Sequence, residues 1–187
     1  MSGSCPSRTF SWHAASVATF ILTVVGDDRP GLVSAVSAPI SAHGASWERS
    51  QMSRLAGKFA GIVLVTVADQ RLDALVADLT ALNDQGLQVV IERAADPDAP
   101  VSQRLSLELL GADHPGIVAE ISASLATRHV SIEELSTEVR EAPMAGGTLF
   151  EARAVLNAPP DASTEGLRSL LESLADELMV EIRLSDD

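Results

Sequence analysis

The chain has 187 residues, of which 46% are apolar, which suits one ordinary domain or two small ones and excludes a disordered tail. It carries 13 basic and 26 acidic residues, a net charge of −13, with Lys58 as its single lysine and no basic cluster, so direct nucleic-acid binding is not expected. The single cysteine, Cys5, excludes an intramolecular disulfide and a thiolate metal site.

Residues 1–17 are mostly small and polar, with Phe10 and Trp12 as the large apolar side chains. We interpret them as a loose N-terminal extension. They lack the charged start and continuous apolar stretch of a secretory signal, and no run approaches the roughly 20 apolar residues of a membrane helix. A cytoplasmic location is therefore the expectation. The four histidines show no metal-ligand spacing, and neither a metal nor a cofactor is expected.

Residues 18–93 give the signals of a first domain, in the order strand, helix, strand, strand, helix, strand. The expected strands span residues 19–25, 45–55, 59–67 and 87–91, and the expected helices span 30–43 and 72–82. The first and third strands are rich in apolar and β-branched residues without polar alternation, as is typical of central strands, whereas the second is polar, as is typical of an edge. Pro39 falls inside the first helix, which it should kink or shorten.

Residues 94–102 have the composition of a linker, and residues 103–187 then repeat the same order of elements as a second domain. Strands are expected at 103–110, 130–140, 148–156 and 178–184, and helices at 115–128 and 164–177. Ser124 replaces the helical proline, so the first helix of this domain should be more regular. The hairpin loop before the third strand is longer, through residues 143–147.

One eight-residue stretch occurs in both halves, where the first strand ends and the first helix begins. It reads Gly-Asp-Asp-Arg-Pro-Gly-Leu-Val from Gly26 and Gly-Ala-Asp-His-Pro-Gly-Ile-Val from Gly111. Gly31 and Gly116 lie 85 positions apart, and this offset continues without a gap into the helix. Each half is therefore one structural unit. The pattern predicts an α+β fold of two tandem ferredoxin-like βαββαβ units, each an antiparallel four-stranded sheet in the order 4-1-3-2 with two helices on one face.

The shared stretch has the chemistry of a strand-to-helix corner with exposed N–H donors. A proline at the first helical position loses no hydrogen bond, and an aspartate just before it could accept N–H bonds of the first turn. The glycine has no side chain, so a ligand could approach the backbone. A plain helix start explains one such motif, but two at the same topological position favour a binding site.

No pattern of a catalytic site accompanies the motif. The sequence contains no Gly-x-Ser-x-Gly, His-Glu-x-x-His or phosphate-binding loop. Asp113 and His114 could be imagined as an acid/base pair, but neighbours at a helix start usually point apart. The position that matches His114 in the first unit is Arg29, which cannot shuttle a proton near neutral pH. We expect a protein that is not an enzyme.

The βαββαβ order with Asp-x-Pro-Gly-(Leu/Ile)-Val after the first strand resembles the ACT domain family, small regulatory modules of which many bind amino acids. Two copies with no enzyme or DNA-binding domain attached resemble the glycine cleavage system transcriptional repressor family. The resemblance implies a small effector, such as an amino acid, near this corner. The implied ligand-binding residues are Asp28, Arg29, Pro30, Gly31, Leu32, Val33, Asp113, His114, Pro115, Gly116, Ile117 and Val118.

The resemblance also implies action on a transcription activator through protein–protein contact, without contact to the operator. The alternative is an amino-acid-sensing module that controls a metabolic enzyme. In either case an effector carboxylate could bind the free N–H groups of the helix start, and an aspartate could receive the ammonium group. The sequence does not identify the effector.

A last expectation concerns the sheet face away from the helices. An offset of 89 in the third strand pairs Ile62 and Leu64 with Glu151 and Arg153, so the second sheet is polar towards solvent and the first is apolar. The apolar positions expected at an interface are Ile21, Ile62 and Leu64. Such a patch predicts a homodimer with a two-fold contact. The alternative is that the aromatic pair of the extension folds back over it.

Overall fold

The computed structural model describes residues 16–94, 102–142 and 146–186. The chain divides into two compact units between residues 97 and 98, which we call unit 1 and unit 2. Most of the expected extension and linker and the middle of the long hairpin loop lie outside the described residues. So do Cys5 and the aromatic pair Phe10 and Trp12, and the proposal that this pair covers the sheet is left untested.

Unit 1 has the expected order of elements, and its three apolar strands, β1, β3 and β4, are longer than predicted. The strands are β1 (Val17–Asp27), β2 (Ser46–Leu55), β3 (Lys58–Ala68) and β4 (Leu87–Arg93), and the helices are α1 (Leu32–Ala42) and α2 (Asp69–Thr80). A short 3-10 helix, η1 (Ala81–Gln85), follows α2.

Unit 2 repeats this order. Its strands are β5 (Gln103–Ala112), β6 (Ser131–Glu141), β7 (Thr148–Ala158) and β8 (Val180–Asp186), and its helices are α3 (Ile117–Ala126) and α4 (Thr164–Leu178). Helix α4 joins β8 through Met179 alone, as the sequence indicated.

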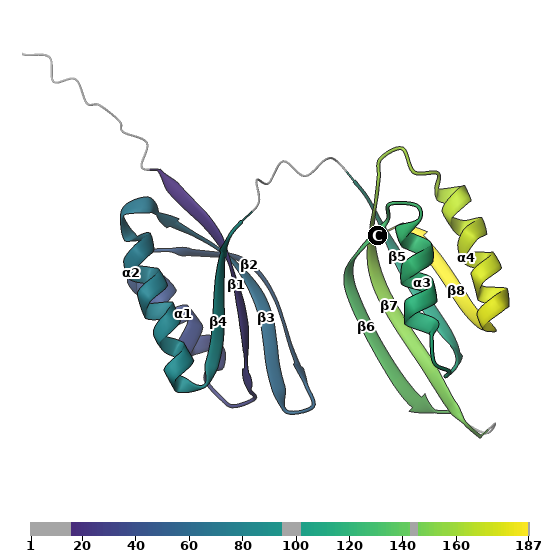
Figure 1. Ribbon diagram of the computed structural model, residues 1–187, viewed down its shortest axis with the longest axis horizontal. Coiled ribbons are helices and arrows are strands. Elements are labelled where there is room, and N and C mark those ends of the chain that lie inside the picture. Colours follow the sequence, from purple (N-terminus) through teal and green to yellow (C-terminus); the bar gives the residue numbers. More distant parts are fainter. Residues whose placement is uncertain (1–15, 95–101, 143–145, 187) are drawn as a thin grey trace, which may run out of the picture. The chain divides into compact units, whose positions relative to one another are not determined.

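The strands of each unit form one antiparallel sheet, in the orders β2-β3-β1-β4 and β6-β7-β5-β8. This is the predicted spatial order 4-1-3-2. In each unit both helices cover one face of the sheet (Figure 1). The predicted α+β fold of two tandem ferredoxin-like units is confirmed.

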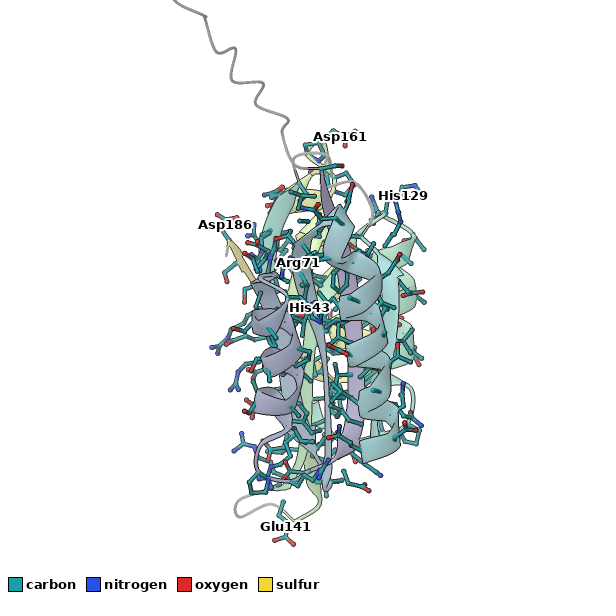
Figure 2. All side chains as sticks on the ribbon, turned by 90° about the vertical axis from the view of Figure 1, so that its left-hand side faces the viewer. His43, Arg71, His129, Glu141, Asp161 and Asp186 are labelled. Atoms are coloured by element: carbon teal, nitrogen blue, oxygen red, sulfur yellow. The ribbon has the colours of Figure 1, made fainter. Side chains whose placement is uncertain are left out.

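Each unit buries its own apolar core between the helices and one face of the sheet. Side chains alternate along a strand, so Phe20, Leu22 and Val24 of β1 lie inside, where the helix residues Val36 and Ile40 meet them. The matching strand of unit 2 buries three leucines. A polar contact also joins the two helices of unit 1. His43, labelled in Figure 2, is the C-cap residue of α1. Its Nε2 atom lies 2.7 Å from a carboxylate oxygen of Asp78 on α2.

The helix starts differ from the prediction. Pro30 and Pro115 do not occupy the first helical position, because the glycine that follows each adopts a left-handed conformation and caps the helix. Pro39 does not shorten its helix, since α1 has 11 residues and α3 has 10. The proline removes only one hydrogen bond near the last turn, and buried Ile40 holds that turn in the core.

The register of the third strand corrects the predicted offset. Ile21 pairs with Leu64 in unit 1, and Ser106, its counterpart at offset 85, pairs with Val155 in unit 2. The third-strand offset is therefore 91 instead of 89, because the hairpin insertion of unit 2 is two residues longer than the sequence comparison indicated. A two-residue error leaves every side chain on its predicted face, but the counterpart of Leu64 is apolar Val155.

A glycine at the end of each first strand lets the fourth strand pass close by. A Cβ atom on Gly111 would lie 2.4 Å from a methyl group of Val180 and 2.9 Å from its Cα atom. A Cβ atom on Gly26 would lie 2.9 Å from a methyl group of Leu87. The conserved geometry of the two units thus explains why the repeated stretch begins with glycine.

Candidate functional site

The unit 1 loop, residues 28–31, connects β1 to α1 and presents the start of the helix to solvent. Gly31 has φ 91°, a left-handed conformation that is strained for any residue with a side chain. Its carbonyl accepts the first helical hydrogen bond from the Ala35 N–H at 2.8 Å. No side chain caps α1. The N–H groups of the first turn lack partners within the helix, and no atom lies within 4 Å of the place where a Gly31 side chain would begin.

The sequence predicted that Asp28 caps α1, but the Asp28 side chain does not do so. Its N–H donates to the Gly57 carbonyl at 2.9 Å, and its carboxylate faces Arg54 of β2, with 3.5 Å between Oδ2 and Nη1. In unit 2 the Asp113 carboxylate turns instead towards the Thr148 hydroxyl, and α3 has no side-chain cap either. In each unit, the aspartate that we expected to cap the helix instead contacts the hairpin between the second and third strands.

The residue between the aspartate and the proline contacts a backbone carbonyl at the end of η1 in unit 1 and at the end of α4 in unit 2. Arg29 donates from Nη2 to the Gln85 carbonyl at 2.8 Å in unit 1. In unit 2, Nε2 of His114 lies 3.0 Å from the Leu178 carbonyl. Sequence reasoning missed this role because the partners are 56 and 64 positions away. These side chains hold the loop in place, and neither points to an acid/base reaction.

His114 meets a carbonyl oxygen at each ring nitrogen, since Nδ1 also lies 3.2 Å from the carbonyl of Pro115. A neutral imidazole has one N–H and cannot donate to both, whereas the protonated ring can. The Leu178 carbonyl foremost, and then that of Pro115, raise the pKa of His114 above its usual 6.5, and the nearby carboxylates of Glu120 and Asp113 add to this against a desolvation cost.

The unit 2 loop, residues 113–116, contains a carboxylate of its own. Gly116 has φ 107°, and a Cβ atom placed there would lie 3.1 Å from Oε1 of Glu120. Glu120 belongs to the first turn of α3, so its carboxylate is attracted by the positive end of the helix dipole. The matching residue of unit 1 is Ala35. The carboxylate of Glu120 therefore lies close to the start of α3 without capping it, whereas the matching position of unit 1 carries no carboxylate.

The surrounding cations follow the same division. Arg54 lies beside the unit 1 loop, and Lys58 pairs with neighbouring Asp27 and lowers its pKa. Their counterparts in unit 2, taken from the strand registers, are Val139 and Leu149. The unit 1 loop therefore has two ion pairs beside it, between these cations and Asp27 and Asp28, whereas the unit 2 loop has apolar side chains at the positions of the two cations.

The remaining candidate residues divide by burial. Leu32 and Ile117 are core residues, 4% and 2% exposed, so only their backbone N–H groups could face a ligand. Val33 and Val118, 46% and 43% exposed, present their side chains to solvent beside the loops. Within the described ranges, no group of three or more His, Cys, Asp or Glu residues could hold a metal ion, and no helix is long and apolar enough to cross a membrane.

Comparisons with known proteins agree with this architecture. The family model of the ACT domain matches residues 18–92. The glycine cleavage system transcriptional repressor of Escherichia coli (strain K12) is 22% identical over 160 residues, which cover 84% of each chain. A crystal structure of an unknown protein from Galdieria sulphuraria is 31% identical, with a TM-score of 0.82, and the match covers 92% of this chain and 99% of that one.

Proposed function

We propose that this chain, whose residues 18–92 match the family model of the ACT domain, is a non-enzymatic regulatory protein of that family that binds an amino acid at the unit 1 loop. One observation carries the proposal. At this loop, helix N–H donors, a carboxylate and an arginine lie together, and among the described residues nothing beyond the chain neighbours lies within 4 Å of a Cβ atom placed on Gly31. At the same position in unit 2 a carboxylate oxygen of Glu120 lies 3.1 Å away.

The chemistry of the unit 1 loop suits both charged groups of an amino acid. The effector carboxylate accepts hydrogen bonds from the first-turn N–H groups of Val33 and its neighbours, where the helix dipole favours negative charge. Arg54 adds a second cationic donor. The ammonium group pairs with the Asp28 carboxylate, which lies beside Arg54. The exposed Val33 side chain is then placed to contact the side chain of the effector.

In this proposal the two loops have different roles. The unit 1 loop binds the effector, whereas Glu120 supplies the carboxylate of the unit 2 loop and His114 fastens that loop to α4. The expected stoichiometry is therefore one effector per chain. The sequence left open whether one loop or both would bind, and the difference between Ala35 and Glu120 favours one.

The regulatory output that we propose is repressor-like: the protein, as a homodimer in the cytoplasm, contacts a transcription activator and does not contact DNA. The similarity to the glycine cleavage system transcriptional repressor supports this reading, and so does the acidic charge of the chain. Control of a metabolic enzyme is the alternative. Capture of bound proteins from a cell lysate distinguishes the two, because the partner is an activator in one case and an enzyme in the other.

Calorimetry of the full chain against the twenty amino acids tests the effector site. We expect one amino acid to bind with one site per chain, and at 100 times its dissociation constant to stabilise the folded state by about 2.7 kcal/mol. Gly31→Val should abolish binding, and the matched Gly116→Val should retain it. Absence of binding by every amino acid at millimolar concentration contradicts the proposal, and so does a bound effector that Gly31→Val leaves in place.

A further inference from the structure

The sheet of unit 1 exposes an apolar face on the side away from its helices. This apolar face consists of Ile21 and Val25 of β1, Ile62 and Leu64 of β3, and Val90 of β4. Ile62 on the central strand β3 is 46% exposed, and Val90 on the edge strand β4 is 55% exposed. Contiguous apolar groups of this kind usually mark an interface.

Three of the five matching positions in unit 2 carry polar or charged side chains. The registers place Ser106, Leu110, Arg153, Val155 and Arg183 at the positions of the apolar face. Arg153 forms ion pairs with Glu108 and Glu151, and Arg140 pairs with Glu151 at 3.3 Å. A shallow cavity of about 150 Å³ lies among these charged groups. The apolar face is thus a property of unit 1 and not of the fold.

Two opposite charges flank the apolar face in a single row across the sheet. Glu92 on β4 pairs with Ile21, Ile21 pairs with Leu64, and Leu64 pairs with Arg49 on β2. Directly opposed residues share a face, so both charged side chains project from the apolar side. Both residues are exposed, and neither forms an ion pair within the described ranges.

This row is self-complementary under one kind of two-fold axis. If a second copy faces the first about an axis parallel to the strands, β4 of each copy lies over β2 of the other. Glu92 then lies opposite Arg49 twice, and the apolar residues meet between them. An axis across the strands would instead place β4 over β4, so that each Glu92 lies near the Glu92 of the other copy and each Arg49 near the other Arg49. Electrostatics therefore selects the axis along the strands.

We propose that the apolar face of unit 1 binds the same face of a second copy, about a two-fold axis parallel to the strands, with two Glu92–Arg49 ion pairs across the interface. Packed sheets lie about 10 Å apart, a gap that two long side chains can span. Four strands about 4.8 Å apart and about eight residues long present roughly 500 Å² per copy, so two copies bury about 1,000 Å², enough for a specific interface. The inference deepens the homodimer of the proposed function.

Charge exchange tests the contact and its axis together. Sedimentation equilibrium of the full chain should show a dimer at micromolar concentration. Arg49→Glu and Glu92→Arg should each weaken the dimer by on the order of tenfold, because each creates two like-charge contacts. The double variant, with both changes in one chain, should restore it. Arg183→Glu is the control, since it makes the same change of charge at the unit 2 position that matches Val90.

Several outcomes overturn the proposal. A chain that is monomeric at micromolar concentration overturns it. So does a chain that dimerises only after residues 1–15 are removed, because those residues would then be what covers the apolar face in the full chain. A dimer that survives Ile62→Glu combined with Leu64→Glu, with circular dichroism showing a folded chain, also does so. A double charge variant that stays as weak as the single ones rejects the axis. Calorimetry with the effector on the same variants shows separately whether the unit 1 loop still binds.

Discussion

Replacement of Arg54 by valine gives unit 1 the residue that unit 2 has at the matching position, Val139. We expect Arg54→Val to weaken effector binding without unfolding the protein. The Arg54 side chain is 70% exposed and its one ion pair, with Asp28, is 3.5 Å long, so its removal leaves no buried charge unpaired.

The size of the effect follows from that exposure. A hydrogen bond to a charged group contributes about 1.5–3 kcal/mol when it is shielded from water, whereas an exposed ion pair contributes roughly 0.2–1 kcal/mol. Because most of the Arg54 side chain faces solvent, we expect about 1 kcal/mol. This corresponds to a roughly fivefold increase in the dissociation constant.

Calorimetry at low and high salt measures the change. The wild-type affinity should fall more steeply with salt than that of Arg54→Val, since exposed charges are screened. Val139→Ala is the matched control and should bind as the wild type does. If Arg54→Val binds as tightly as the wild type, or if Val139→Ala weakens binding as much, the assignment of the effector to the unit 1 loop is refuted.

Three further predictions concern unit 2 and the whole chain. Because the pKa of His114 is raised in the folded protein, its protonated form stabilises the fold below pH 6.5, and this contribution is lost as the pH rises through the folded-state pKa. Between about pH 6 and pH 8, the melting temperature of His114→Gln should therefore fall less than that of the wild type. Gly111→Ala should cost about 1–3 kcal/mol in urea unfolding, because its Cβ meets the backbone of Val180, and more than Gly26→Ala, whose Cβ meets the end of a flexible side chain. The purified protein should give no gel shift with duplex DNA at physiological salt, given its net charge of −13, and a shift would contradict this.

The fold could be predicted from the sequence because its signals are local and occur twice. Alternation and apolar runs marked the strands, and the 85-residue repeat fixed the position of the corner between first strand and first helix in both units. The polar β2 and the apolar β1 and β3 also predicted which strands lie at the edge and in the centre. Besides the helix starts and the effect of Pro39, the third-strand offset was wrong, because a loop insertion hides how many residues belong to the hairpin.

The arrangement around the corner could not be predicted in the same way. Whether Asp28 faces the helix or the hairpin depends on where the β2–β3 turn places Arg54, and that residue lies far along the chain. The contact of His114 with Leu178 likewise depends on the return of α4. Glu120 and Ala35 were visible in the alignment of the repeats, but a glutamate in a first helical turn becomes informative only when its carboxylate is found beside Gly116.

The two units share a backbone and differ in what they leave unfilled. Unit 2 has the Glu120 carboxylate beside its helix start and ion-paired arginines on its open sheet face. Unit 1 has Ala35 in place of the glutamate, and its sheet face is apolar. Both open features lie along β1, which carries Ile21 on the apolar face and ends next to the unit 1 loop. In our proposal, unit 1 therefore provides both the effector site and the dimer contact, and the single strand β1 connects them.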